Sequence, residues 1–416
     1  MPFQKYGARR RSLSALAILG AGLMAVGGTA PAAAAQDISS QQWYLKDMQA
    51  DSMWKVSKGR GVTVAVIDTG VDASRVDLRG RVLKGTDASD KATNPHNDPN
   101  GHGTNMAGLI AGTGEGGGMQ GLAPEAKILP VKASLIDMQV ESVGSVMAKA
   151  IRYSVDHGAK VLNISLGVTG IPAYFSKTQS AVNYALKKGA LIFAATGNTG
   201  DKKNSSEYPS VLPGVVGVGA IDRTGKVAEF STSGDQVGLA AIGDEIPVLC
   251  KNNQTVCTTH GTSDATAITS ASAALIWSKH PEWTNNQVLR VMMQTAAKPT
   301  TGDIPSSYLG YGSVRPRKVL LDGEGDPGPA NTNPLLAREG ATKPEPSGSA
   351  SKPAGDPSQS PASDEQAAEK PAAEAKTSDD GGNTTLWVAL GAGVVVVGAA
   401  VAFTVVRRRG GTMARP

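Results

Sequence analysis

Short apolar runs rich in β-branched residues alternate with longer helical patterns from Val62 onward, and this alternation limits the fold more than any other feature of the chain. Such an order is typical of a parallel sheet covered by helices on both faces, because the strands of that sheet are buried on both sides. We therefore predict an α/β domain with a doubly wound, mostly parallel sheet. The predicted strands are residues 62–68, 127–132, 160–165, 190–196 and 215–221.

Local signals place two of the helices. Residues 140–156 have a helical pattern and are followed by His157 and Gly158. A histidine complements the negative end of a helix and a glycine adopts positive φ, so this pair suits a helix terminus and His157 is predicted to be structural. Thr284 and Gln287 have the capping-box spacing and predict the start of another helix.

Three separated segments carry the residue types of nucleophilic catalysis. Asp68 ends a predicted strand, His102 lies in Gly-His-Gly-Thr, and Ser263 opens a segment rich in small residues at 263–279 that is predicted to be a closely packed helix. A serine hydroxyl needs a base to remove its proton, and that base needs a carboxylate to orient it. We therefore predict that Asp68, His102 and Ser263 form a catalytic triad.

Other residues compete for these roles. Each of the three segments alone would also suit an ordinary α/β domain, so the prediction depends on their combination. Asp72 and Asp77 lie close to Asp68 and are interpreted as loop charges. The remaining histidines lack the setting between two glycines; they are His96, His157, His260 and His280.

The chain resembles the subtilase family over about residues 61–321. The resemblance is carried by the Asp, His, Ser order and by residues 194–198 (Ala-Ala-Thr-Gly-Asn), which lie between the histidine and the serine. The resemblance implies a serine endopeptidase. It also implies that the Asn198 side chain and the Ser263 N–H form an oxyanion hole. The simpler alternative for Asn198 is a turn residue after Gly197.

The same resemblance implies that Ser165, Leu166 and Gly167 pair with an extended substrate and line its specificity pocket. Alternatively, these residues only end a strand. No cofactor and no metal are expected: calcium, which many subtilases bind, has no recognisable ligand loop here. The Asp-Pro-Asn stretch at 98–100 is interpreted as the turn that leads into His102.

The sequence departs from the common subtilase pattern at three positions. Ala267 replaces a proline, Asn105 replaces a second histidine, and Asp264 directly follows the predicted nucleophile. If Asp264 lies near His102, it will raise the pKa of the imidazole and weaken the base at neutral pH. If it points away, it will only complement the helix dipole.

The two ends of the chain have the composition of export and membrane segments. Residues 1–35 have a basic start, an apolar run and small residues before the end, which predicts a secretory signal; Sec and twin-arginine export both stay open. Residues 323–384 are rich in Pro, Ala, Ser and Glu and predict a disordered linker. The apolar stretch at 385–406 predicts a transmembrane helix, although a buried soluble helix is an alternative. Three arginines follow it, so the tail at 407–416 is expected in the cytoplasm and the catalytic region outside the cell membrane.

Between the signal and the peptidase domain predicted at 61–322 lies an extension at 36–60, too short for a folded inhibitory propeptide. With the linker and the single anchor, this organisation resembles the mycosins, the subtilases associated with type VII secretion in actinobacteria. The resemblance implies a membrane-anchored serine endopeptidase that hydrolyses protein substrates outside the membrane. There are two alternatives. The protein is a structural component of the secretion machinery whose proteolysis is dispensable, or it is an inactive pseudo-peptidase.

Cys250 and Cys257 are the two cysteines of the chain. In an exported protein they predict a disulfide, with two free thiols as the alternative. The bond would rigidify the approach to Ser263 or would only close a surface hairpin. The net charge of +5 comes partly from the arginines of the signal and the tail, so it gives no argument for nucleic-acid binding.

Overall fold

The computed structural model describes residues 37–337, apart from 90, 92, 134, 136–137 and 252–254. The predicted signal, transmembrane helix and cytoplasmic tail, and most of the predicted linker, lie outside these residues. Within residues 37–337, taken with those gaps, no helix is long and apolar enough to cross a membrane. The secretory signal, the transmembrane helix and the cytoplasmic tail therefore stay predictions from the sequence.

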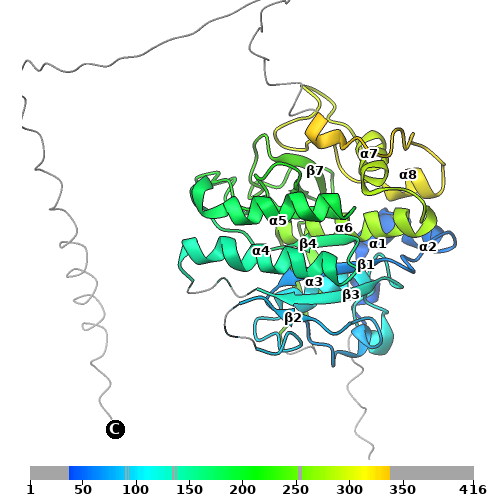
Figure 1. Cartoon of the computed structure of the whole chain (residues 1–416). Helices are drawn as coiled ribbons and strands as arrows, with labels where there is room; N and C mark the ends of the chain where they lie inside the picture. The colour runs from blue at the N-terminus through cyan, green and yellow to red at the C-terminus, as the bar shows by residue number, and fades with distance from the viewer. Residues whose placement is uncertain are drawn as a thin grey trace, which may run out of the picture. The chain divides into compact units, whose positions relative to one another are not determined.

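Seven strands form one sheet in the order β2-β3-β1-β4-β5-β6-β7 (Figure 1), and every neighbouring pair is parallel. The chain builds β2 and β3 on one side of β1 and then moves to the other side for β4 to β7. This is the doubly wound arrangement, in which the carboxyl ends of the strands meet at a topological switch point. The strands are β1 Thr63–Asp68, β2 Thr86–Asp87, β3 Lys127–Lys132, β4 Val161–Ile164, β5 Leu191–Ala195, β6 Val216–Ile221 and β7 Val237–Ile242.

Alternate residues of each strand feed two separate hydrophobic cores. In β1, Val64 and Val66 belong to one core and Ala65 and Ile67 to the other. Helices α4 Val140–Asp156 and α5 Ser176–Lys187 cover the second core (Figure 1). Helices α3 His102–Ala111 and α6 Thr262–Lys279 belong to the first core, together with shorter helical segments from both ends of the described region.

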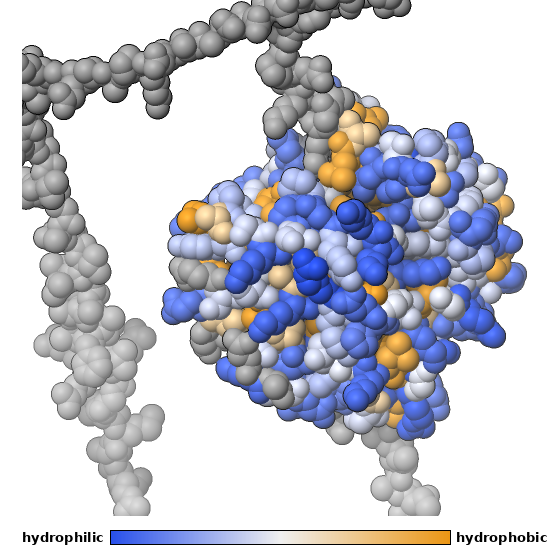
Figure 2. Space-filling view, viewed as in Figure 1, coloured by the Kyte–Doolittle hydropathy of each residue, from blue (hydrophilic) through white to orange (hydrophobic). Residues whose placement is uncertain are grey.

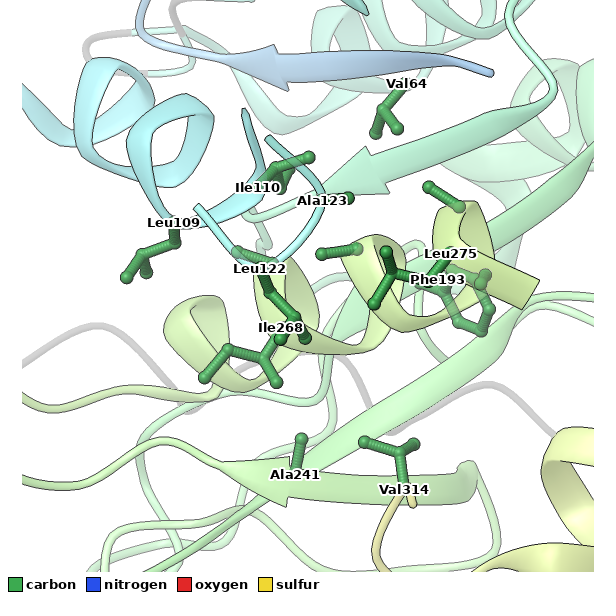
Figure 3. Close-up of a cluster of buried hydrophobic side chains, with 14 of the residues drawn as sticks. Val64, Leu109, Ile110, Leu122, Ala123, Phe193, Ala241, Ile268, Leu275 and Val314 are labelled. Carbon is green, nitrogen blue, oxygen red and sulfur yellow. The ribbon is translucent and has the colours of Figure 1, made fainter. Parts of the chain in front are cut away.

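Helix α6 runs through the middle of the first core (Figure 3). Its side chains Ile268 and Leu275 pack among residues from α3 and from strands β1, β5 and β7. Most of the remaining buried residues of α6 are Ala, Ser and Thr, which allow neighbouring backbone to come close. The closely packed helix predicted at 263–279 is therefore confirmed, and Ser263 lies in its first turn.

Most predicted elements agree with the structure. The five predicted strands correspond to β1, β3, β4, β5 and β6, and the helix at 140–156 is confirmed together with its end at Gly158, where φ is +81°. His157 Nδ1 bonds the carbonyl of Tyr153 at 2.9 Å, which is a structural role. The capping box of Thr284 and Gln287 opens α7 as predicted.

Other elements were not expected from the sequence. Strand β2 has two residues, and β7 follows β6 without a helix between them, so the alternation gives no signal for either. An antiparallel hairpin of β8 and β9 also lies outside the pattern. The further bounds are β8 Ile246–Leu249, β9 Val256–Thr259, α7 Asn285–Thr295, α8 Pro316–Leu320, η2 Val76–Leu78, η3 Glu115–Gly117 and η4 Pro172–Phe175.

Segments at both ends of the described region pack onto the domain. The N-terminal extension forms η1 Ser39–Gln41, α1 Trp43–Asp47 and α2 Ala50–Trp54, and its Tyr44 and Met53 are fully buried. The face of the domain drawn in Figure 2 is mainly hydrophilic, with apolar residues in small separate patches.

The C-terminal segment extends the packed region beyond the expected boundary at residue 322. Arg290 of α7 donates to the carbonyls of Pro329 and Thr332 at 3.0 and 2.6 Å, and Leu335 is buried. The residues up to Leu335 are therefore part of the domain, although their Pro- and Gly-rich composition predicted linker. Backbone carbonyls, which composition does not reveal, hold them in place.

Candidate active site

Asp68 is the last residue of β1, at the edge where the carboxyl ends of the parallel strands meet. Its side chain is fully buried. Its Oδ1 accepts hydrogen bonds from the Thr69 N–H and from His102 Nδ1, both at 2.7 Å. Because a carboxylate can only accept, Nδ1 carries the proton and Nε2 is left to receive one.

Glycines on both sides of His102 allow α3 to start close to β1. Gly101 has φ +88°, a left-handed conformation that favours glycine. A Cβ at Gly103 would lie 2.2 Å from the carbonyl oxygen of Gly70 and 2.9 Å from the Cβ of Asp68. The Gly-His-Gly motif therefore brings the histidine within reach of the carboxylate.

Asp98 fixes the turn before His102 to the end of β1. Its Oδ1 accepts from Thr69 Oγ1 and the Gly101 N–H, both at 2.8 Å. Its Oδ2 accepts from the N–H and Oγ1 of Thr104 at 2.9 and 2.6 Å. The stretch was predicted to be the turn into His102, which is confirmed, but the sequence did not indicate that Asp98 organises it.

The surroundings of His102 make it a strong base. Desolvation opposes the imidazolium, but the charge and hydrogen bond of Asp68 outweigh that cost, and the charges of Asp264 and Asp98 add to them. Together they raise the pKa of His102 to about 9. The side chain is 33% exposed, so the ring is open to a substrate from one side.

Ser263 lies half-buried in the first turn of α6. Its Oγ donates to the carbonyl of Ser165 at 3.2 Å, and Ser165 Oγ donates to the carbonyl of Ser263 at 3.3 Å. Among the contacts of the described residues, Ser263 Oγ makes no hydrogen bond to His102. The hydroxyl must therefore leave Ser165 before it can donate to Nε2.

Asn198 follows β5 and faces the start of α6. Its Oδ1 accepts from the N–H of Thr262 at 2.9 Å and from Thr262 Oγ1 at 3.0 Å. A backbone N–H can only donate, so these contacts fix the orientation of the amide and turn Nδ2 the other way. The residue is exposed, and Nδ2 would lie 3.4 Å from a Cβ built at Gly261. Nδ2 makes no hydrogen bond within the described residues, so its hydrogens are available beside Gly261, two residues before Ser263.

The segment predicted to bind substrate lies beside His102. Ser165, Leu166 and Gly167 line a cavity of about 360 Å³ together with His102. Ser165 is also in direct contact with Ser263, so the structure brings this segment to both predicted catalytic groups. The other residues of the wall are Thr69, Asn100, Ala133, Leu135 and Val168.

Asp264 is buried directly behind the predicted nucleophile, with 1% of its surface exposed. Its Oδ1 has no hydrogen-bond partner among the described residues. Burial raises the pKa of Asp264 to about 7, although the charge of His102 and a hydrogen bond from Thr259 act in the opposite direction. Of the two alternatives left by the sequence, the structure favours the one in which Asp264 acts on His102.

The hairpin of β8 and β9 connects the two halves of the site. A disulfide joins Cys250 and Cys257, as predicted. The Leu249 carbonyl accepts from Asn105 Nδ2 at 2.9 Å, so the hairpin is attached to α3 as well as leading into α6. Asn105, one of the departures from the subtilase pattern, therefore has a structural role, which Arg75 supports by donating to its Oδ1 at 3.0 Å.

The competing candidates lie outside the site. Asp72 accepts from Ser74 within its own turn. Asp77 is not the loop charge that was expected, because it is buried and forms an ion pair with Arg75 (Nε to Oδ1, 2.6 Å). Within the described part of the chain, no group of three or more His, Cys, Asp or Glu residues could hold a metal. The other histidines contact Leu83 (His96), Tyr153 (His157), Phe230 (His260) and Trp283 (His280).

Comparisons with known proteins indicate the family to which this chain belongs. The model of the subtilase family matches residues 59–312. Thermitase from Thermoactinomyces vulgaris is 34% identical over 283 residues, which cover 68% of this chain and 96% of thermitase. The crystal structure of MycP1 from the ESX-1 type VII secretion system has a TM-score of 0.61 at 27% identity and covers 70% of this chain and 88% of its own. MycP3 protease from the ESX-3 type VII secretion system has a TM-score of 0.58 at 31% identity, with 71% and 90% covered.

Proposed function

The chain belongs to the subtilase family of serine endopeptidases, and from this premise we propose that Ser263 is its nucleophile, His102 its general base and Asp68 the carboxylate that orients the base. The observation that carries the proposal is the 2.7 Å hydrogen bond from His102 Nδ1 to Asp68. It leaves Nε2 free at the wall of a cavity that Ser165, a neighbour of Ser263, also lines.

In the proposed acylation step, Ser263 Oγ forms a bond to the carbonyl carbon of the peptide while His102 Nε2 takes the hydroxyl proton. The carbonyl electron pair moves onto the oxygen, which then carries the negative charge. Asn198 Nδ2 and the Ser263 N–H donate to that oxygen, and the N-terminal end of α6 adds a favourable dipole. When the tetrahedral intermediate collapses, the leaving amine takes the proton from His102.

Deacylation repeats the sequence with water. His102 removes a proton from water as the water oxygen attacks the ester carbon, and returns it to Ser263 Oγ as the acyl group leaves. Neutral His102 is required at the start of both steps. Because the pKa of His102 is about 9, roughly one molecule in a hundred has a neutral ring at pH 7, and activity is expected to rise towards alkaline pH.

Labelling of the full-length protein with a fluorophosphonate tests the nucleophile. We expect a single labelled peptide that contains Ser263, located by mass spectrometry, and a labelling rate that rises with pH. Ser263→Ala should abolish the label, whereas Ser74→Ala, which changes an exposed turn residue, should not. Absence of label from a folded sample would argue for an inactive pseudo-peptidase.

The finer part of the proposal concerns location. We propose that the enzyme is anchored in the cell membrane by the apolar stretch at 385–406, faces outward, and acts on protein substrates together with a type VII secretion complex. The similarity to MycP1 and MycP3 supports the secretion link, and the three arginines after the stretch support the orientation. Protease accessibility of the domain in intact cells tests the orientation.

A scaffold role in the secretion complex is the second candidate. It is favoured by the geometry, in which Ser263 Oγ is bonded to Ser165, and by the raised pKa of His102, which reduces the amount of neutral base at pH 7. Secretion by a Ser263→Ala strain, compared with that of a full deletion, separates the two roles. Restored secretion by the mutant would favour the scaffold, and its failure despite normal protein levels would favour proteolysis.

A further inference from the structure

Glu207 is held beside the predicted substrate segment by a short antiparallel bridge. Val168 and Tyr208 exchange two backbone hydrogen bonds, of 3.2 and 2.9 Å. The bridge places Glu207 next to Gly167, and Ser210 Oγ fixes its backbone by donating to its carbonyl at 2.6 Å. The position of Glu207 is therefore defined by backbone contacts that do not involve its carboxylate.

The carboxylate of Glu207 lies between two glycines. A Cβ built at Gly167 would lie 2.2 Å from Glu207 Oε2, and a Cβ built at Gly197 would lie 2.9 Å from Oε1. Gly167 is partly exposed, whereas Gly197 is buried. Both positions must lack a side chain for the carboxylate to occupy this place.

These two glycines belong to the segments that meet Ser263. Gly167 is two residues after Ser165, which accepts the hydrogen bond from Ser263 Oγ. Gly197 precedes Asn198 and donates from its N–H to Thr262 Oγ1 at 3.1 Å. A peptide carbonyl held between Ser263 and Asn198 would therefore place the side chain of the same residue near Gly167 and Gly197, between which the Glu207 carboxylate lies.

The carboxylate of Glu207 has no partner in the part of the chain that the structure describes. Among the described residues, no cation forms an ion pair with Glu207 and no donor forms a hydrogen bond with its side chain. The residue is half-buried, and burial raises the pKa of its carboxyl. A charged group in this position loses hydration without compensation, so a ligand that brings a positive charge would be favoured.

We propose that Glu207 selects substrates with lysine or arginine at the residue whose carbonyl Ser263 attacks. The proposal rests on the proposed function of Ser263 and adds the substrate class to it. The ammonium or guanidinium group would form charge-assisted hydrogen bonds with the carboxylate between Gly167 and Gly197. An uncharged side chain of similar length would leave the carboxylate without a partner, and an acidic one would be repelled.

Matched peptides test this inference on the full-length protein in detergent. The peptides differ only in the residue before the scissile bond, which is Lys, Arg, Gln, Leu or Glu. We expect kcat/KM for the Lys and Arg peptides to exceed that for the Gln peptide by about 10- to 100-fold, the range of one charge-assisted contact. Glu207→Gln should remove this difference, and Glu207→Lys should reverse it in favour of the Glu peptide.

Two controls separate selectivity from damage to the site. Glu115→Gln changes a carboxylate that is 56% exposed in η3 and should leave the basic preference intact. Labelling of Ser263 by a small fluorophosphonate should stay within a few-fold of the wild-type rate in both Glu207 variants. A merely structural Glu207 would affect all the peptides alike and would not reverse their order.

The outcomes distinguish the two levels of the proposal. If Ser263 is labelled but the peptides show no basic preference, or if Glu207→Gln keeps that preference, the inference about Glu207 is wrong and the nucleophile stands. If no peptide is cleaved and no label is found, the proposed function is wrong and the inference is overturned with it.

Discussion

Asp98 and Asp264 are two carboxylates that act on the same histidine in different ways. Both oxygens of Asp98 are occupied, by donors from Thr69, Gly101 and Thr104. Asp264 is buried with an oxygen that has no partner among the described residues. A carboxylate with a full set of donors holds the backbone in place, whereas one with a spare oxygen mainly contributes its charge.

The same distinction applies to the other groups of the site. Asp68 uses Oδ1 for two hydrogen bonds, while its Oδ2 has no partner in the described part of the chain. Asn198 uses Oδ1 to hold Thr262 and leaves Nδ2 unoccupied by that contact. In each side chain, one polar atom fixes the position of the group and the other is left without that task. Mutations can test which of the two atoms determines the activity.

The largest effect is expected from Asp68→Asn. The amide has no negative charge to stabilise the imidazolium, and when its Nδ2 faces the ring it donates to His102 Nδ1 and favours the wrong tautomer. We expect kcat to fall by about 10⁴-fold, measured with a fluorogenic peptide. Asp72→Asn, in the neighbouring turn, is the matched control and should keep full activity. A loss below tenfold for Asp68→Asn would remove Asp68 from the triad.

Asn198→Ala should have the next largest effect. Loss of one oxyanion-hole donor typically lowers kcat by about 100- to 1,000-fold while KM changes little. Asn198→Asp is the informative partner, because it keeps an oxygen for Thr262 but replaces the donor Nδ2. If the loss comes from Nδ2, both variants will be impaired; if it comes from the contact to Thr262, Asn198→Asp will retain most of its activity.

The sequence predicted the sheet and the candidate triad because their signals are local. Buried parallel strands are apolar runs, and the glycines around His102 mark a close approach of backbone that the structure confirms. The helix at 140–156 and the capping box at Thr284 were found in the same way. Each of these signals is made by residues that are neighbours in the chain, although the triad prediction also depends on the combination of three distant segments.

The features that the sequence did not predict depend on contacts between distant segments. Glu207 is nine residues after Asn198 in a polar stretch, and only the bridge between Val168 and Tyr208 brings it to Gly167. Burial of Asp264 could not be decided from the sequence, because both of its alternatives suit the first turn of a helix. Charge alone does not show whether a carboxylate has a partner.

Asp98→Asn should lower stability more than it changes chemistry. An amide would turn its Nδ2 towards donors that now face a carboxylate oxygen, and at least one of them would be left unpaired. We expect the free energy of unfolding to fall by about 1–3 kcal/mol, measured by denaturant titration. The matched comparison is Asp264→Asn, which leaves no donor of the turn without a partner. Equal stability of Asp98→Asn and wild type would contradict the role of Asp98 as the group that fixes the turn.

The smallest and most specific effect is expected from Asp264→Asn, which should move the acidic limb of the pH–kcat/KM profile. In the wild type, ionised Asp264 favours the imidazolium and contributes to the raised pKa of His102. Removal of that charge lowers the pKa of His102, so a larger fraction of the base is neutral at pH 7 and the limb moves to lower pH. Asp98→Asn should move the limb in the same direction by less, because Asp98 contributes less than Asp264 to the raised pKa.

Measurements at low and high salt, together with an exposed control variant, distinguish the effect of buried Asp264 from that of surface charges. Because Asp264 is buried, its effect on His102 should persist at high ionic strength, at which charges on the surface are screened. Asp303→Asn changes an exposed carboxylate and should leave the profile unchanged. If the limb of Asp264→Asn coincides with that of the wild type at low and high salt, Asp264 has no influence on the base. The contrast with Asp98 would then be one of packing alone, and the spare oxygen of Asp264 would have no electrostatic consequence for His102.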